Sequence, residues 1–317
     1  MRFLVAGAGS WGTAFTHVLR ERGHDVVLAC HTEEQAQAIN ETERNPRSLP
    51  KVDLSGVEAV PLERAPADVD IAVVAVPSKS FAQVVAGLPG DAPVLSLTKG
   101  LDPATGERLS TTVRGRAVAV LSGPNMAEEI AVGLPTAAVI ASDDGYLAGE
   151  LQHAVNSTVF RAYVNPDVVG VELCAAAKNV IGLAAGGVDG LDLGDNSKAA
   201  LITRGLAEMS RLGEAAGARP ETFAGLAGMG DLIVTCWSRH GRNRHAGELI
   251  AQGLSPDEAI AQIGQTVEGI TTAPVLHELS LRLGVELPIT EGVCAVLSGQ
   301  SLTELVSALM GRQPTEE

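Results

Sequence analysis

The first half of the chain alternates between short apolar runs and segments whose apolar residues have helical spacing. The runs are bounded by Gly, Pro or Asp, which is typical of buried strands, and they cover residues 2–6, 26–29, 71–76, 94–97, 117–121, 136–141 and 159–164. Helical patterns lie between several of them, for example at residues 13–19 and 80–85. This alternation predicts an α/β fold with a doubly wound, mostly parallel sheet of the Rossmann type.

The pattern changes near Asn165-Pro166. We expect Asn165 to cap a helix and Pro166 to be its first residue. From there helical spacing predominates, at residues 168–185, 198–212, 246–251, 273–283 and 291–297. The sequence therefore predicts a dinucleotide-binding domain at residues 1–165, an all-helical domain at residues 166–317, and a frayed tail over residues 313–317.

A glycine-rich turn directly follows the first predicted strand and precedes the first predicted helix. Its sequence is Gly7-Ala8-Gly9-Ser10-Trp11-Gly12. In the dinucleotide fingerprint, the first glycine permits a tight turn, the second lets the backbone approach a pyrophosphate, and the third lets helix and strand pack closely. The helix N-terminus then offers free N–H groups to the phosphates. We expect a bound dinucleotide, NAD or NADP; a glycine-rich turn without ligand is the alternative.

The amino-acid composition limits which partners the protein can bind. The 317 residues include 23 Lys and Arg against 38 Asp and Glu, a net charge of −15, and only 3% aromatic residues. Such a surface repels nucleic acid and anionic membranes. The cysteines match no zinc spacing, no apolar run approaches transmembrane length, and the first strand leaves no room for a leader. We expect a cytoplasmic protein with a small-molecule substrate, no nucleic acid, no membrane insertion and no metal.

Lys178 is the first candidate for chemistry. It is the single cation in the predicted helix at residues 168–185, among alanines and glycines. If it is buried there, its pKa falls toward neutrality and it can exchange a proton. Asn179 beside it would donate to a carbonyl or hydroxyl. The alternative is a lysine that reaches solvent along a small-residue helix.

Three further segments carry polar groups of interest. Asp231 ends a glycine-rich turn, where it serves chemistry or caps the next helix, and Thr235 follows one turn later. Arg242-Asn243-Arg244 supplies planar donors suited to phosphate, unless it is an exposed surface cluster. Lys99 directly follows a predicted strand, at the sheet edge where ligands bind in this fold class.

Taken together, these segments resemble the bacterial NAD(P)-dependent glycerol-3-phosphate dehydrogenases. The resemblance spans nearly the whole chain, and its most specific part is the ordered set Lys178-Asn179, Gly230-Asp231-Leu232 and Arg242-Asn243-Arg244. It also includes Asn45-Pro46, Ala75-Val76-Pro77-Ser78, Thr98-Lys99-Gly100, Ser122-Gly123-Pro124, Gly194-Asp195-Asn196 and Val267-Glu268-Gly269.

The resemblance implies reduction of dihydroxyacetone phosphate to sn-glycerol 3-phosphate, for glycerophospholipid synthesis, with Lys178 as the general acid. It implies a substrate site formed by Lys99, Gly123, Asn125, Lys178, Asn179, Asp231, Thr235, Gly241, Arg242 and Asn243. It implies a cofactor site formed by Gly7, Gly9, Ser10, Trp11, Gly12, His31, Lys99, Ala127, Arg242, Thr266 and Glu268. A homodimer through the helical domain is compatible with this pattern.

The chain departs from the family pattern at Asn125, Gly241 and Thr266, where the family usually has Ser or Thr, Ser, and Val. The second strand ends in His31 rather than in the acidic residue typical of NAD-specific sites. We therefore expect NADPH to be used at least as well as NADH. Two alternatives stay open: a related hydroxy-acid or ketopantoate-type reductase, and a non-catalytic NAD(P)-binding sensor.

Overall fold

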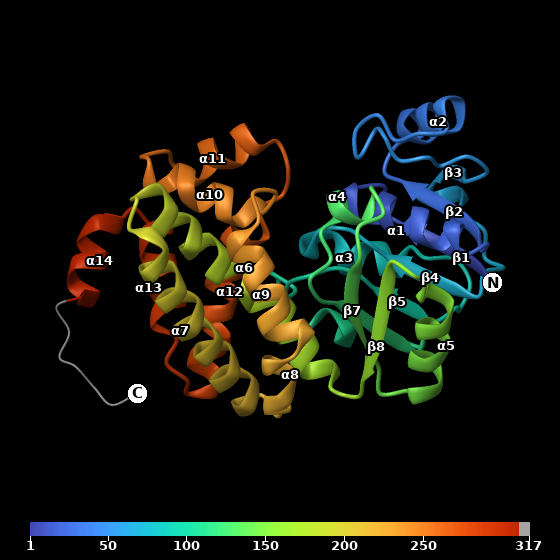
Figure 1. Ribbon diagram of the computed structural model, residues 1–317. Helices are drawn as coiled ribbons and strands as arrows, with labels where there is room; N and C mark the ends of the chain where they lie inside the picture. Colours follow the sequence, from blue (N-terminus) through green and yellow to red (C-terminus); the bar gives the residue numbers. More distant parts are fainter. Residues whose placement is uncertain (311–317) are drawn as a thin grey trace.

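In the computed structural model, which describes residues 1–310, the first half forms one eight-stranded sheet in the order β3-β2-β1-β4-β5-β6-β7-β8 (Figure 1). All neighbouring strands are parallel except β6 and β7, which pair antiparallel. The predicted doubly wound, mostly parallel sheet is confirmed. The strands are β1 (Arg2–Ala6), β2 (Asp25–Cys30), β3 (Glu58–Pro61), β4 (Ile71–Val74), β5 (Val94–Ser96), β6 (Val118–Ser122), β7 (Thr136–Ala141) and β8 (Phe160–Asn165).

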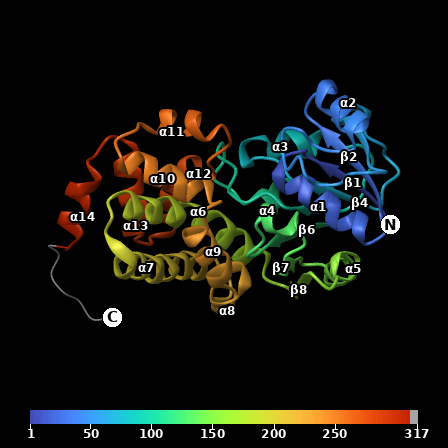
Figure 2. The same cartoon turned by 45° about the horizontal axis from the view of Figure 1, so that its top comes forward.

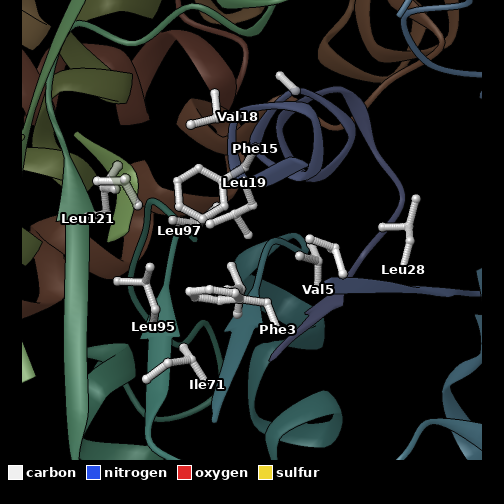
Figure 3. Close-up of a cluster of buried hydrophobic side chains, with 14 of the residues drawn as sticks. Phe3, Val5, Phe15, Val18, Leu19, Leu28, Ile71, Leu95, Leu97 and Leu121 are labelled. Atoms are coloured by element: carbon white, nitrogen blue, oxygen red, sulfur yellow. The ribbon is translucent and has the colours of Figure 1, made fainter. Parts of the chain in front are cut away.

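Both faces of the sheet are buried along its central strands, which explains why these are continuous apolar runs, whereas the edge strand β8 alternates buried and exposed residues over Phe160–Tyr163. Along β1, Phe3 and Val5 face one layer of helices, while Leu4 and Ala6 face the other. Figure 3 shows the first layer, where Phe15 and Leu19 of α1 lie over Phe3 of the sheet. The helices of this half are α1 (Ser10–Glu21), α2 (Glu33–Thr42), α3 (Ser78–Ala86), α4 (Ala127–Ile130) and α5 (Gly145–Val155).

The second half is helical and is organised around one buried helix, α6 (Val168–Gly190). Figures 1 and 2 show α6 surrounded by the other helices of this half. Its glycines and alanines let α10 approach it closely: a Cβ on Gly186 would lie 1.8 Å from the carbonyl oxygen of Arg244. The other helices are α7 (Gly194–Ala215), α8 (Pro220–Ala224), α9 (Asp231–Trp237), α10 (Arg242–Ala251), α11 (Pro256–Ile263), α12 (Glu268–Leu283), α13 (Pro288–Leu297) and α14 (Leu302–Met310).

The structure corrects the predicted start of α6. Asp167, not Asn165, is the N-cap, and the first helical residue is Val168 rather than Pro166. Asn165 instead accepts a hydrogen bond from the Asp167 backbone N–H through its side-chain oxygen. Strand β3 and helices α2, α4, α5, α8, α11 and α14 were not predicted. The predicted tail over residues 313–317 lies outside the described residues.

A second correction concerns α6 as an apolar segment. Among residues 1–310, α6 alone is long and apolar enough to span a membrane, although the sequence was expected to hold no such run. Within the protein, however, 89% of the apolar stretch of α6 is buried. This burial is typical of the core helix of a folded domain.

Asp167 is expected to be the cap on which this core helix depends. Its carboxylate accepts from the Gly170 N–H, the Arg219 N–H and the Thr222 hydroxyl, and the residue is 6% exposed. Asp167→Ala would leave these buried donors unpaired and cost roughly 3 kcal/mol of unfolding free energy.

The measurement is thermal denaturation beside Asp144→Ala, which removes the exposed N-cap of α5. The α5 variant should lose about 1 kcal/mol. Equal shifts in Tm for the two variants would contradict the central position given to Asp167.

Candidate functional site

The glycine-rich turn joins β1 to α1 and leaves no room for side chains at two positions. Gly7 has φ of 118°, and a Cβ there would lie 2.4 Å from the Ala75 carbonyl oxygen. A Cβ on Gly12 would lie 1.8 Å from the Gly7 carbonyl oxygen. A Cβ on Gly9, in contrast, would meet no protein atom within 4 Å. Backbone N–H groups at the start of α1 are thus open to a ligand, and the cradle fits a dinucleotide pyrophosphate.

A cleft of about 470 Å³ runs from this turn to the buried helix α6. Most of the predicted site residues line it, namely Gly9, Ser10, Trp11, Lys99, Asn125, Ala127, Lys178, Asn179, Thr235, Gly241, Arg242, Asn243, Thr266 and Glu268. The cleft therefore combines groups from the carboxyl edge of the sheet with groups from α6, α9, α10 and α12. A separate cavity of about 110 Å³ has an almost wholly apolar lining from α6, α7, α10, α13 and α14, and carries no group suited to catalysis.

The cleft ends at a buried carboxylate held between two ammonium groups. Lys178 Nζ donates to Asp231 Oδ1 at 2.5 Å, and Lys99 Nζ donates to Asp231 Oδ2 at 2.9 Å. Ser122 Oγ donates to the same Oδ2 at 3.3 Å. Asp231 is 1% exposed and Lys178 is 5% exposed, so the alternative of a solvent-reaching Lys178 is wrong.

These surroundings shift both pKa values. Burial lowers the pKa of Lys178 to about 7, against the attraction of Asp231 that works to raise it. Burial works to raise the pKa of Asp231, but the two ammonium groups outweigh it and hold the pKa below its usual value. Asp231 is thus ionised at neutral pH while Lys178 is poised to gain or lose a proton.

Asp231 reaches this position because the chain makes a π-helical turn, Leu226–Gly230, directly before α9. Asp231 is the first residue of α9, yet its carboxylate accepts from side chains across the cleft and not from the helix. The alternative of a simple capping residue is therefore wrong. Thr235 lies one turn later on the same face, and its hydroxyl accepts from Lys178 Nζ at 3.0 Å.

Lys99 is tied to the sheet as well as to Asp231. Its Nζ donates to Asn125 Oδ1 at 2.7 Å and to the Gly123 carbonyl oxygen at 3.2 Å. Gly123 and Asp231 do not line the cleft themselves. They lie behind its wall and hold Lys99, which does line it. Asn125 thus supplies an amide oxygen to the lysine.

Arg242, Asn243 and Arg244 are the first three residues of α10, and their side chains have different partners. Arg242 is exposed at the cleft and donates to the Thr266 carbonyl oxygen at 3.0 Å. Asn243 donates to Asn179 Oδ1 at 2.9 Å and accepts from the Gly269 N–H. Arg244 turns away and pairs with Asp189 at 2.7 Å. The alternative of one exposed surface cluster is wrong for Asn243 and Arg244.

One predicted residue lies outside the cleft lining, and the backbone of another is already hydrogen-bonded. His31 lies exposed directly after β2 and does not line the cleft. The Gly241 N–H donates to the Ser238 carbonyl oxygen at 3.1 Å and is therefore already used within the protein. Glu268 crosses the cleft, because its carboxylate accepts from the Ser78 N–H and hydroxyl at 3.1 and 2.7 Å.

Sequence reasoning missed several cleft residues, among them Arg47, Ser48, Met126, Glu128, His240 and Gln265. Arg47 and Ser48 directly follow Asn45-Pro46, which the resemblance included without its neighbours. Within residues 1–310 no cluster of His, Cys, Asp or Glu is suited to hold a metal ion.

A Rossmann sheet with a glycine cradle, joined to a helical half that brings a lysine of lowered pKa to the same cleft, defines a two-domain NAD(P)-dependent oxidoreductase. Comparison of the sequence with family models is more specific. Residues 3–148 match the N-terminal part of NAD-dependent glycerol-3-phosphate dehydrogenase, and residues 167–307 match its C-terminal part. The chain belongs to the family of NAD-dependent glycerol-3-phosphate dehydrogenases.

Individual relatives agree along the full length. The chain is 42% identical to glycerol-3-phosphate dehydrogenase [NAD(P)+] of Shouchella clausii, over 100% of this chain and 97% of the relative. The crystal structure of glycerol-3-phosphate dehydrogenase from Coxiella burnetii is 35% identical and superimposes with a TM-score of 0.94, over 98% and 99% of the two chains. A ketopantoate reductase from Ralstonia eutropha, 17% identical over 94% and 97% of the chains with a TM-score of 0.63, shares the fold alone.

The two-lysine arrangement predicts a stability defect that depends on pH. Asp231→Asn would remove the carboxylate that favours the charged form of Lys178, and the pKa of Lys178 would fall below about 7. Below that pH the folded variant must bury an unpaired ammonium or release its proton, so the loss is larger at pH 5.5, roughly 3 kcal/mol, than at pH 8.5.

Thermal denaturation across pH tests this, with Asp189→Asn as the matched control. Asp189 accepts from Lys198 and Arg244, and an arginine keeps its charge throughout this range. The Asp189 variant should therefore not recover at pH 8.5. An Asp231→Asn deficit that is unchanged or larger at high pH would contradict the assignment.

Proposed function

We propose that this protein reduces dihydroxyacetone phosphate to sn-glycerol 3-phosphate with NAD(P)H. The observation that carries the proposal is the buried Lys178 at the cleft, with a pKa lowered to about 7 and a carboxylate partner that keeps the proton available. Membership in the family and the names of the full-length relatives support the same substrate.

In this proposal the protein controls protons and charge, and bound nicotinamide supplies the hydride. Addition of hydride to the C2 carbonyl creates negative charge on its oxygen. Lys178 donates a proton to that oxygen, and Lys99 places its ammonium beside it, held by hydrogen bonds to Asp231 and Asn125. Asp231 and Thr235 hold Lys178 in place, with Asp231 also setting its pKa.

The substrate phosphate is assigned to the outer part of the cleft. Arg242 is exposed there and presents a planar guanidinium. Asn243 and Asn179 bond to each other through their amides, so they shape the wall between phosphate and reacting carbon. The exterior carries net negative charge, and these local cations give the cleft its preference for an anion.

For the cofactor we propose Gly9, Ser10, Trp11, Ala127, Thr266 and Glu268 as contacts, with Gly7 and Gly12 shaping the turn. NADPH is used at least as well as NADH, because β2 ends without an acidic residue at its tip. The dinucleotide-binding unit is residues 1–165 and the substrate-binding unit is residues 166–317.

The physiological role is production of the glycerol phosphate backbone of phospholipids in the cytoplasm. A homodimer through the helical part stays a prediction. Its support is a stripe of exposed apolar side chains formed by Met229 of the π-helical turn and by Ile233 and Trp237 of α9, at a spacing of four residues.

The first test is oxidation of NADPH by purified protein with dihydroxyacetone phosphate, beside Lys178→Ala. We expect turnover in the native protein and a loss of at least about 10³-fold in kcat/KM in the variant, because both the acid and a positive charge are removed. Calorimetric binding of cofactor should persist in both proteins.

Native protein that binds cofactor and gives no turnover would overturn the proposal. Turnover with ketopantoate or another 2-keto acid would then favour the related reductases, and no turnover with any ketone would favour the sensor.

The pH dependence of the reduction provides a second test. The acid must be protonated, so kcat/KM for dihydroxyacetone phosphate should fall as pH rises through about 7, the pKa of Lys178. The fall should approach tenfold per pH unit, and the reverse oxidation should rise over the same interval. Steady-state rates at saturating cofactor measure this, and a kcat/KM constant up to pH 9 would contradict Lys178 as the acid.

A further inference from the structure

Two segments converge on one residue of the glycine-rich turn. The Ala8 carbonyl oxygen accepts from Asn45 Nδ2 at 2.9 Å and from Gln35 Nε2 at 3.0 Å. Asn45 is fully buried and also donates to the Thr13 hydroxyl of α1. The start of α2 and the loop that follows it are therefore fixed against the turn, at the end of β2.

Arg47 is held at the cleft by this arrangement. Its backbone N–H donates to Asn45 Oδ1 at 3.2 Å, and its side chain lines the cleft together with Gly9, Ser10 and Trp11. Within residues 1–310 the Arg47 guanidinium makes no hydrogen bond or ion pair to the protein. Arg44 in the same loop, in contrast, donates to the Lys51 carbonyl oxygen at 2.9 Å.

The acidic residues at the start of α2 both have favourable neighbours. Thr32 caps this helix, and Glu33 and Glu34 form its first turn. Glu33 pairs with Arg64. Glu34 is exposed, and its own helix N-terminus, the Thr32 hydroxyl and the charge of Arg47 lower its pKa. The carboxylates that would repel a second phosphate here are thus partly offset.

The geometry points to Arg47 as the residue that recognises the 2′-phosphate of NADP(H), a role that no residue of this loop was expected to have. In a doubly wound fold, the adenosine ribose lies outside the end of β2, beside the glycine turn. Arg47 lines the cleft beside Gly9 and Ser10 of that turn, and its charge acts on Glu34 in the first turn of α2. A free guanidinium offers two parallel donors to a phosphate, whereas His31 lies off the cleft lining.

This inference rests on the proposed use of NADPH and names the group that makes it possible. Removing Arg47 should weaken NADP⁺ by about ten- to a hundredfold, as expected for a charge-assisted bidentate contact, and NAD⁺ by less than about threefold. Glu34→Gln removes a negative charge that opposes the 2′-phosphate. It should therefore have the opposite effect and strengthen the binding of NADP⁺ more than the binding of NAD⁺.

Calorimetry with two fragments separates the 2′-phosphate from the pyrophosphate. Adenosine 2′,5′-bisphosphate carries the 2′-phosphate and AMP does not, and neither contains a pyrophosphate. We expect native protein to bind the bisphosphate more tightly, Arg47→Ala to bind the two fragments alike, and Arg44→Ala to resemble native protein. Folding of each variant is checked by its Tm.

If Arg47→Ala weakened the binding of both fragments equally, Arg47 would be assigned to the 5′-phosphate and the inference would be overturned. Loss of the bisphosphate preference in His31→Ala but not in Arg47→Ala would also overturn it. Because fragment binding needs no turnover, a protein inactive toward dihydroxyacetone phosphate would refute the proposed substrate while leaving this measurement intact.

Discussion

One buried carboxylate, Asp231, holds the site together. It joins Lys99 at the edge of the sheet to Lys178 on the central helix, and it is fully enclosed in doing so. A lone ion in such a place would be costly to bury, and a pair only partly offsets that cost. Two cations around one anion leave a net positive charge that faces the cleft. Because the partners come from the two halves of the chain, the same contact fixes how those halves face each other.

The helical half depends on α6 to support this contact. The small residues of α6 admit neighbouring backbone on several sides, so α9 and α10 lie against it and bring Thr235 and Asn243 to the level of Lys178 and Asn179. Asp189, Lys198 and Arg244 form a second ion-pair cluster near the end of α6. By anchoring Arg244, this cluster sets the start of α10, where Arg242 and Asn243 are presented to the cleft.

The sequence predicted the sheet well because buried parallel strands are short apolar runs with clear boundaries. The sequence predicted helix boundaries and side-chain roles poorly where two neighbouring residues suit the same role or where the partners are distant in sequence. Asn165 and Asp167 are both good caps, and the donors at the start of α8, the Arg219 N–H and the Thr222 hydroxyl, favour Asp167. The role of Asp231 was undecided because its lysine partners lie 53 and 132 residues away in sequence. Arg47 was missed because a lone arginine in a loop carries no pattern, and only the fold places it beside the glycine turn.

The balance of charge around Asp231 also explains why the reactive lysine has a pKa near neutrality. Burial alone would leave Lys178 neutral, and Lys99 acts in the same direction. A neutral amine has no proton to give to a developing alkoxide. A second carboxylate would return the pKa toward its ordinary value, and the ammonium would then be too weak an acid at neutral pH. With one shared carboxylate, Asp231 keeps Lys178 able to give or accept a proton near pH 7, and in the proposed reaction Lys99 adds its ammonium beside the oxygen that receives the proton.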